Sequence, residues 1–357
     1  MPELTGSSIL VTGGAGFVGS NLVRLLLGSQ PRSIRVVDNL LSAERWNLPD
    51  DRSVELLEGS IADDAVLERI EDDYDFVFHL ATYHGNQSSI HDPLADHEHN
   101  QLTTLKLFDR IRNYRRLQKV VYSGAGCAVA RKTFDETEAT AEDGPVHLDM
   151  DSPYSISKLV GEMYALYYAQ RHRTPIVRAR FQNVYGPGEI LGAGRWRGTP
   201  ATVWRNVTPT FIFKALKHEA LPLESGGRAT RDFIFVEDIA RGLVACALRG
   251  SPGDVYNLAS GIETSIADLA ARINAIIGNP APPADKPGRD WDRSGRRFGS
   301  TRKTKAALGF EAEVPLQRGL ERTVEWTREH LARIEGCMAR HRDALAAYER
   351  SHQNAVA

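Results

Sequence analysis

Thr12-Gly13-Gly14-Ala15-Gly16-Phe17-Val18-Gly19 directly follows the apolar run Ser8–Thr12 and opens the amphipathic segment Ser20–Leu27. A glycine turn between a strand and a helix is typical of a dinucleotide-binding site. Gly13 permits the tight turn, Gly16 leaves room for a pyrophosphate at the backbone, and Gly19 lets the helix approach the sheet. The first helical N–H groups, including those of Phe17 and Val18, then face the phosphates.

Asp38 ends the second apolar run, Ile34–Asp38, at 19 residues beyond Gly19. A carboxylate at this position accepts hydrogen bonds from the adenosine ribose and repels a 2′-phosphate, so the sequence predicts NAD rather than NADP.

Short apolar runs continue to alternate with helical patterns along the first half of the chain. The expected strands are Ser8–Thr12, Ile34–Asp38, Val54–Leu57, Phe76–Leu80, Lys119–Tyr122 and Thr174–Ala179. The expected helices include Ala65–Ile70, His97–Arg112, Pro153–His172, Thr208–Lys217 and Val236–Leu248. This alternation predicts an α/β fold, a doubly wound parallel Rossmann sheet with a smaller C-terminal α/β substrate domain. We expect residues 1–180, plus part of 230–260, to bind NAD, 181–335 mainly to bind substrate, and 336–357 to form a helical tail.

Bulk composition narrows the function. The 357 residues are 42% hydrophobic and carry a net charge of −2, which predicts no partnership with nucleic acid or a membrane surface. Cys127, Cys246 and Cys337 have no paired spacing, and the histidines show no metal-ligand pattern, so we expect a cytoplasmic protein without a metal site.

Tyr154 and Lys158 are four residues apart near the start of the expected helix Pro153–His172. This spacing places both side chains on one helical face. An ammonium beside a phenol favours the phenolate, so we expect Lys158 and a bound nicotinamide cation to lower the pKa of Tyr154. Such a tyrosine can remove a hydroxyl proton while a hydride leaves the same carbon.

Six motifs, in this order along the chain, resemble those of the extended short-chain dehydrogenase/reductase family. Within this family, the resemblance is greatest to the nucleotide-sugar epimerases such as UDP-glucose 4-epimerase. They are Thr12–Gly19, Asp38, His79-Leu80-Ala81, Ser152–Lys158, Arg180–Pro187 and Thr230–Phe233. The resemblance covers roughly residues 8–325. It implies tightly held NAD, a nucleotide-diphosphate sugar as substrate and a homodimer.

The resemblance also implies roles for individual residues. Tyr154 is the expected base, and Lys158 binds the nicotinamide ribose. Further cofactor contacts are expected from Asn39, Ser60, Ile61, Leu80, Ala81 and Thr82. Substrate contacts are expected from Tyr83, His84, Asn183, Arg197, Arg231 and Arg289, of which His84 is also a candidate proton carrier. Guanidinium groups suit a diphosphate because they bind it through two hydrogen bonds.

Two positions depart from the family pattern. Ser60 replaces an acid that contacts adenine, and Ala125 stands where a serine or threonine usually binds the reacting hydroxyl. Ser123 through a shifted turn, Cys127, or water could take over that second role. Cys127 falls where GDP-mannose 3,5-epimerases carry an acid/base cysteine. The absence of Asp and Glu between Ser123 and Lys132 argues against the family's dehydratases and decarboxylases, which resemble one another in placing a carboxylate there.

These features leave several functions open. C4 epimerisation of the sugar through a 4-keto intermediate ranks first, followed by C3 or C5 epimerisation next to a transient ketone with Cys127 as acid/base. A net NAD-dependent sugar dehydrogenase or reductase and a non-catalytic NAD-binding regulator are the other candidates. The arginines and tryptophans between Gly192 and Asn206 suggest a charged sugar, by stacking and ion pairing.

Overall fold

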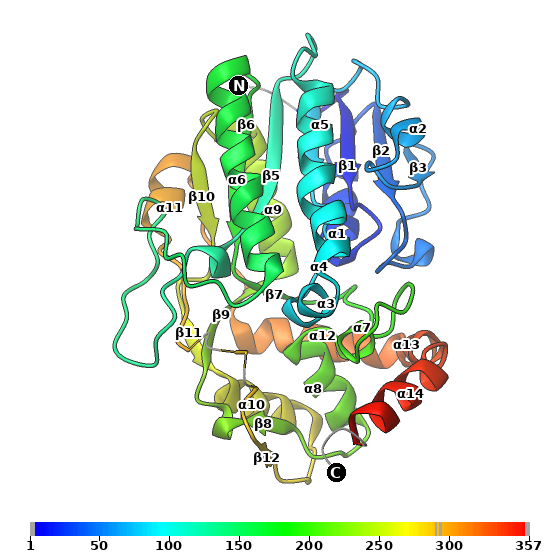
Figure 1. Ribbon diagram of the computed structural model, residues 1–357, viewed down its shortest axis with the longest axis vertical. Helices are drawn as coiled ribbons and strands as arrows, with labels where there is room; N and C mark the ends of the chain where they lie inside the picture. Colours follow the sequence, from blue (N-terminus) through cyan, green and yellow to red (C-terminus); the bar gives the residue numbers. More distant parts are fainter. Residues whose placement is uncertain (1–3, 290, 293–294, 354–357) are drawn as a thin grey trace.

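A seven-stranded parallel sheet forms the upper part of the molecule (Figure 1). The computed structural model describes residues 4–289, 291–292 and 295–353. Along the sheet the strand order is β10-β6-β5-β4-β1-β2-β3, and every neighbouring pair is parallel. The strands are β1 (Ser8–Thr12), β2 (Ser33–Asp38), β3 (Val54–Glu58), β4 (Phe76–His79), β5 (Lys119–Ala125), β6 (Ile176–Phe181) and β10 (Val255–Leu258).

Helices cover both faces of this sheet because successive strand residues point to opposite sides. The helices around it are α1 (Phe17–Leu27), α2 (Asp64–Leu67), α3 (Asn86–His91), α4 (Pro93–Asp96), α5 (Thr103–Ile111), α6 (Pro153–His172), α9 (Val236–Arg249) and α11 (Arg302–Leu308). Ile9 and Val11 of β1 pack in the core beneath α1 and α9, whereas Leu10 belongs to the core beneath α5 and α6. The predicted doubly wound Rossmann fold is confirmed.

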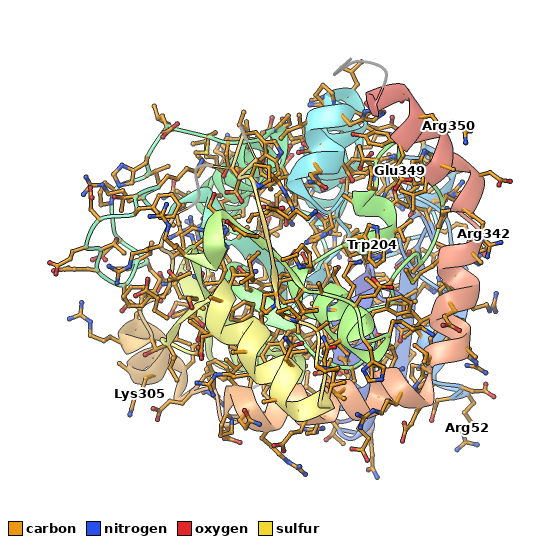
Figure 2. All side chains as sticks on the ribbon, turned by 90° about the horizontal axis from the view of Figure 1, so that it is seen from below. Arg52, Trp204, Lys305, Arg342, Glu349 and Arg350 are labelled. Atoms are coloured by element: carbon orange, nitrogen blue, oxygen red, sulfur yellow. The ribbon has the colours of Figure 1, made fainter. Side chains whose placement is uncertain are left out.

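A smaller group of elements lies below the carboxyl ends of the strands (Figure 1). It holds a three-stranded sheet, β11-β9-β7, and a two-stranded one, β12-β8. Its elements are β7 (Asn183–Tyr185), α7 (Ala201–Trp204), α8 (Val207–Leu216), β8 (Pro222–Glu224), β9 (Thr230–Phe235), β11 (Glu263–Ser265), α10 (Ile266–Ile277), β12 (Ala284–Lys286) and α12 (Leu316–Glu329). Two further helices, α13 (Leu331–Ala339) and α14 (Arg342–Gln353), run along its edge (Figure 1 and Figure 2).

Several boundaries differ from the sequence prediction. Strand β5 extends three residues further, to Ala125, because it stays paired with β6 up to Phe181. The expected helix at 97–112 begins with a π-helical turn, η2 (His97–Leu102). The structure also contains strand β12, paired in parallel with β8, which was not among the expected strands. Short 3-10 turns, η1 (Arg45–Asn47), η3 (Gly126–Ala128) and η4 (Ser225–Gly227), join other elements. Within the described residues, no helix has the length and apolarity to cross a membrane.

Candidate active site

A cavity of about 920 Å³ lies between the large sheet and the smaller group of elements, a size typical of small-molecule sites. Nearly all of the predicted site residues line it: Gly13, Gly16, Phe17, Val18, Gly19, Asp38, Asn39, Ser60, Ile61, Leu80, Ala81, Thr82, Tyr83, His84, Ser123, Cys127, Tyr154, Lys158, Asn183, Arg231 and Arg289. Arg197 is not among the described lining residues. The carboxyl ends of the parallel strands therefore gather residues that are far apart in the sequence.

The glycine turn leaves a cradle that a larger residue would fill. Gly13 has φ +73°, and a Cβ there would lie 2.6 Å from the Ala81 nitrogen. A Cβ on Gly19 would lie 2.3 Å from the Gly13 oxygen. No side chain caps the first turn of α1, whose N-cap is Gly16, so its N–H groups are available to a phosphate. These residues fit the pyrophosphate of NAD.

Asp38 closes the other side of this turn. Its carboxylate accepts hydrogen bonds from the Ala15 and Leu40 N–H groups, at 3.0 and 2.9 Å. Burial raises the pKa of Asp38, while these backbone hydrogen bonds oppose the rise. The carboxyl group stands at the end of β2, where a ribose contact is expected in this fold.

Tyr154 and Lys158 come from the first two turns of α6. Ser152 caps the helix by accepting from the Ser155 N–H, and Pro153 occupies its first position, so this end of the helix is well fixed. The Lys158 ammonium lies 5.9 Å from the centre of the Tyr154 ring and donates to the Ser123 carbonyl at 3.0 Å. Burial lowers the pKa of Lys158 to about 8, although Asp96, Cys127 and Glu162 favour its charged form.

The expected lowering of the Tyr154 pKa is not found in the chain by itself. Burial raises this pKa well above its ordinary value, and the charges of Cys127, Tyr122 and Asp96 act in the same direction. The Lys158 ammonium lies 5.9 Å from the centre of the Tyr154 ring and donates to the Ser123 carbonyl. It therefore does not outweigh the effect of burial on the Tyr154 pKa. In the protein alone Tyr154 is therefore a neutral phenol.

The end of β5 shows which side chains could replace the hydroxyl that is missing at Ala125. Ser123 donates its hydroxyl proton to the His79 carbonyl at 3.0 Å, and β5 runs on to Ala125 without the shifted turn that would redirect it. Ala125 is 6% exposed and lines the cavity with no polar side-chain atom. Cys127 follows in η3, half-buried, and also lines the cavity. A thiolate at Cys127 would interact electrostatically with Tyr154, Lys158 and Arg231.

His84 forms the wall on another side of Tyr154. The two rings meet edge to face, with centres 5.8 Å apart. Burial, followed by the charges of Arg197, Arg205 and Lys158, lowers the pKa of His84 to about 3. The imidazole is therefore neutral at working pH. It can donate or accept a hydrogen bond, but it is a poor reservoir for a proton.

Arg197 contacts two of the residues that line the cavity, Tyr83 and His84. Its guanidinium donates to the His84 carbonyl at 2.8 Å and stacks over the Tyr83 ring at 5.5 Å. The prediction that Arg197 contacts substrate is therefore not supported, since its side chain, 7% exposed, holds Tyr83 and His84 in place.

Asn100 and Arg297 were missed by the sequence analysis. Asn100, presented by the π-helical turn, accepts from the Tyr83 N–H at 2.8 Å and donates to the Tyr83 carbonyl at 3.2 Å. No spacing rule marks it, because a π-helical turn shifts the helical register. Arg297 lines the cavity with a buried Nη1 for which the described residues offer no hydrogen-bond partner, and no motif in the sequence marked it.

The far end of the cavity carries cationic side chains. Arg231 is 9% exposed and donates to the carbonyls of Thr230 and Gly295, at 2.6 and 3.1 Å. Burial and then the charge of Arg297 lower the pKa of Arg231 to about 9. Arg289 is bridged to Glu224 at 2.6 Å. Asp290, the next residue in the chain, lies outside the described residues. No group of three potential metal ligands occurs among the residues that the structure describes.

A Rossmann sheet, a glycine cradle and a Tyr-Lys pair facing one cavity define an NAD-binding enzyme of the tyrosine-dependent class. Residues 9–259 match the model of the "NAD dependent epimerase/dehydratase family". The chain belongs to this family, and NAD is its cofactor.

Individual relatives show the breadth of the family. A putative UDP-glucose 4-epimerase of Methanocaldococcus jannaschii is 30% identical, over 90% of this chain and 99% of its own. A dTDP-glucose 4,6-dehydratase of Streptomyces antibioticus is also 30% identical, over 91% and 93%. The enzyme WbmF of Bordetella bronchiseptica, solved with NAD+ and with NAD+ and UDP, is 60% identical with a TM-score of 0.87, over 97% and 99% of the two chains. The chain is therefore an enzyme of the NAD-dependent nucleotide-sugar epimerase/dehydratase group.

Proposed function

We propose that the enzyme epimerises a UDP-sugar at C4 through a transient 4-keto intermediate. The observation that carries this proposal is the cavity wall around Tyr154. It offers a tyrosine base and a lysine, and the stretch from Ser123 to Lys132 contains no carboxylate. The elimination of water by a dehydratase needs an acid at this point, so epimerisation is favoured over dehydration.

The cationic end of the cavity supports a nucleoside diphosphate. The charge of Arg297 lowers the pKa of Arg231, and the described residues offer no hydrogen-bond partner to the buried Nη1 of Arg297. A diphosphate between them would relieve this repulsion and complete the hydrogen bonding. Uridine as the base is supported by the UDP bound to the 60% identical Bordetella enzyme.

The residues of this chain divide the work as follows. Gly13, Gly16 and Asp38 would hold the pyrophosphate and ribose of NAD, and Lys158 would bind its nicotinamide ribose. When bound, NAD takes up a hydride from the sugar carbon and later returns it. Tyr154 accepts the proton of the C4 hydroxyl. It gives the proton back after the keto-sugar has rotated in the cavity and presents its opposite face. Because its pKa is raised even with Lys158 in place, Tyr154 would need the positive charge of the oxidised cofactor to release its proton.

Incubation of the purified enzyme with UDP-glucose and related UDP-sugars, without added reductant, tests this proposal. An equilibrium mixture of C4 epimers is expected, and Tyr154→Phe should abolish its formation while NAD stays bound. Stoichiometric accumulation of reduced cofactor would instead identify a net dehydrogenase. NAD binding without turnover of any nucleotide sugar would identify a regulator.

Epimerisation at C3 or C5 is the second candidate, and the placement of Cys127 favours it. Its thiol lines the cavity near Tyr154, and neither Ala125 nor the hydroxyl of Ser123 is available to hold the reacting hydroxyl. A thiol can move a proton at a carbon next to a ketone. Solvent deuterium entering the sugar ring, and lost in Cys127→Ala, would support this route. Direct return of hydride at C4 leaves the ring free of deuterium.

We also propose a homodimer that uses helix α6. Ile156, Met163 and Tyr167 are 46, 57 and 52% exposed, and their spacing places them along one side of the helix. A second copy would cover this apolar stripe. Met163→Glu is expected to lower the mass measured by sedimentation from that of a dimer to that of a monomer, and an unchanged mass would refute this interface.

A further inference from the structure

A segment of the smaller group crosses to the loop that follows β2. We call residues 190–205 the clasp, and residues 39–44 the ribose loop. Arg195 of the clasp donates to the Asn39 carbonyl through Nη2 and to the Leu41 carbonyl through its backbone N–H, both at 3.0 Å. Arg205 donates through Nη2 to the Ser42 carbonyl at 2.8 Å. These arginines, expected to meet a charged sugar, thus bind the protein's own backbone.

A second set of contacts ties the same two segments to the end of α13. Glu44 of the ribose loop accepts from the Gly194 N–H at 2.9 Å and from the guanidinium of Arg340. His341 is within hydrogen-bond distance, 2.9 Å, of the Gly192 carbonyl. Burial raises the pKa of Glu44, but the Arg340 and Gly194 hydrogen bonds outweigh it and leave that pKa below its ordinary value. The carboxylate is therefore charged and joins three parts of the chain.

Close packing shows that these contacts are built into the fold. Gly194 has φ +79°, and a Cβ on it would lie 2.3 Å from the Leu41 oxygen. Gly192 has φ +68°, and its Cβ would lie 2.7 Å from the Met338 backbone. Only glycine permits both the backbone conformation and the approach at these positions. Beside them lies a small hydrophobic core of Ile190, Leu191, Ala193, Phe213, Ile334 and Cys337.

The ribose loop is a wall of the cofactor end of the cavity. Asn39, Leu41 and Ser42 line the cavity directly after Asp38, the residue expected at the adenosine ribose. Arg195 of the clasp and Arg340 at the end of α13 hold this loop without lining the cavity, whereas Trp204 and Arg205 of the clasp also line it. Movement of the loop would break its hydrogen bonds to Arg195, Arg205 and Arg340 together.

We propose that Arg195, Arg205, Glu44 and Arg340 are positioning residues for NAD, which hold the ribose loop in its binding conformation and so set the rate at which the cofactor leaves. The proposal rests on NAD binding and not on which sugar carbon reacts. It gives the C-terminal helices a role in retaining the cofactor. Retention suits a reaction that regenerates NAD in every cycle, because no exchange with free cofactor is needed.

Release of NAD from the holoenzyme tests this proposal directly. Arg340→Ala and Arg195→Ala remove side chains at partly exposed positions, so the variants should fold. Each is expected to release NAD about tenfold faster than wild type, which corresponds to about 1.4 kcal/mol. The rate is measured as loss of bound NAD after dilution into excess competing dinucleotide, together with the unfolding temperature.

Conservative and control variants separate positioning from general stability. Arg340→Lys keeps the charge and should restore most of the slow release. Arg318→Ala removes a comparable exposed pair, with Glu321 on α12, and should leave release unchanged. Because the Glu44–Arg340 pair is partly exposed, added salt should speed release in wild type more than in Arg340→Ala.

The proposal is overturned if Arg340→Ala and Arg195→Ala release NAD as slowly as the Arg318→Ala control. It is also overturned if release follows only the unfolding temperature across all variants. Neither result depends on sugar turnover, so failure of the epimerase assignment would be seen separately, as a wild-type enzyme that retains NAD and converts no UDP-sugar.

Discussion

Replacing Lys158 by methionine is expected to stabilise the fold near neutral pH while it abolishes turnover. The Lys158 side chain is 4% exposed, and burial lowers its pKa from 10.5 to about 8. At about 1.4 kcal/mol per pH unit, keeping this ammonium charged in the folded protein costs about 3 kcal/mol. The hydrogen bond to the Ser123 carbonyl returns about 1 kcal/mol, so methionine should gain about 2 kcal/mol.

The gain should depend on pH in a defined direction. The pKa of Lys158 is lower in the folded than in the unfolded chain, so between pH 8 and 10.5 the unfolded chain binds more protons. Wild-type stability therefore rises with pH in this window. The advantage of Lys158→Met is largest below pH 8 and shrinks as the folded lysine loses its proton.

Denaturant unfolding after removal of NAD, at about pH 7 and about pH 9.5, measures this difference. Lys106→Met, which removes an ammonium paired with Asp64 at the surface, is the control for general effects of pH. A variant that is less stable than wild type at neutral pH, or an advantage that does not change with pH, would refute the reasoning about the buried ammonium.

Three further changes have defined outcomes. Gly19→Ala should abolish NAD binding by equilibrium titration, since its Cβ would meet the Gly13 oxygen at 2.3 Å, and measurable binding would contradict the cradle. Glu162→Gln should lower the free energy of unfolding by about 3 kcal/mol, because it leaves the buried guanidinium of Arg180 without its charged partner, and a loss under about 1 kcal/mol would show that α6 is not anchored by this pair. Ala125→Ser should speed sugar oxidation about tenfold in single-turnover experiments by supplying the hydroxyl that β5 lacks, whereas a slower rate would mean that the cavity uses this space for substrate.

Local patterns predicted the Rossmann sheet and placed the glycine turn at the carboxyl end of its first strand. The sequence alone suggests roles for Gly13, Gly19 and Asp38, because these roles depend on local backbone conformation and on the position at the end of a strand. Helix α6 and its Tyr154-Lys158 face were likewise readable from a proline at its start and a spacing of four. The predicted fold class followed from the alternation of buried strands and amphipathic helices.

Long-range partnerships could not be read in this way. Arg197 looks like a substrate contact until the structure pairs it with the His84 carbonyl. From the sequence the Ser123 hydroxyl could bind the substrate, but in the structure it donates to the His79 carbonyl. Burial reverses the expected direction of the Tyr154 pKa. Each of these outcomes depends on segments that are distant in the sequence and on the desolvation of a buried group, which no spacing records.

Rapid mixing of the NAD-loaded enzyme with a UDP-sugar, followed through the absorbance of reduced nicotinamide, tests the central claim most directly. The account predicts a transient reduced cofactor that decays as the C4 epimer appears, with no net reduction at equilibrium and no transient in Tyr154→Phe. Epimer formation without a reduced-cofactor transient in wild type, or an unchanged transient in Tyr154→Phe, would contradict it.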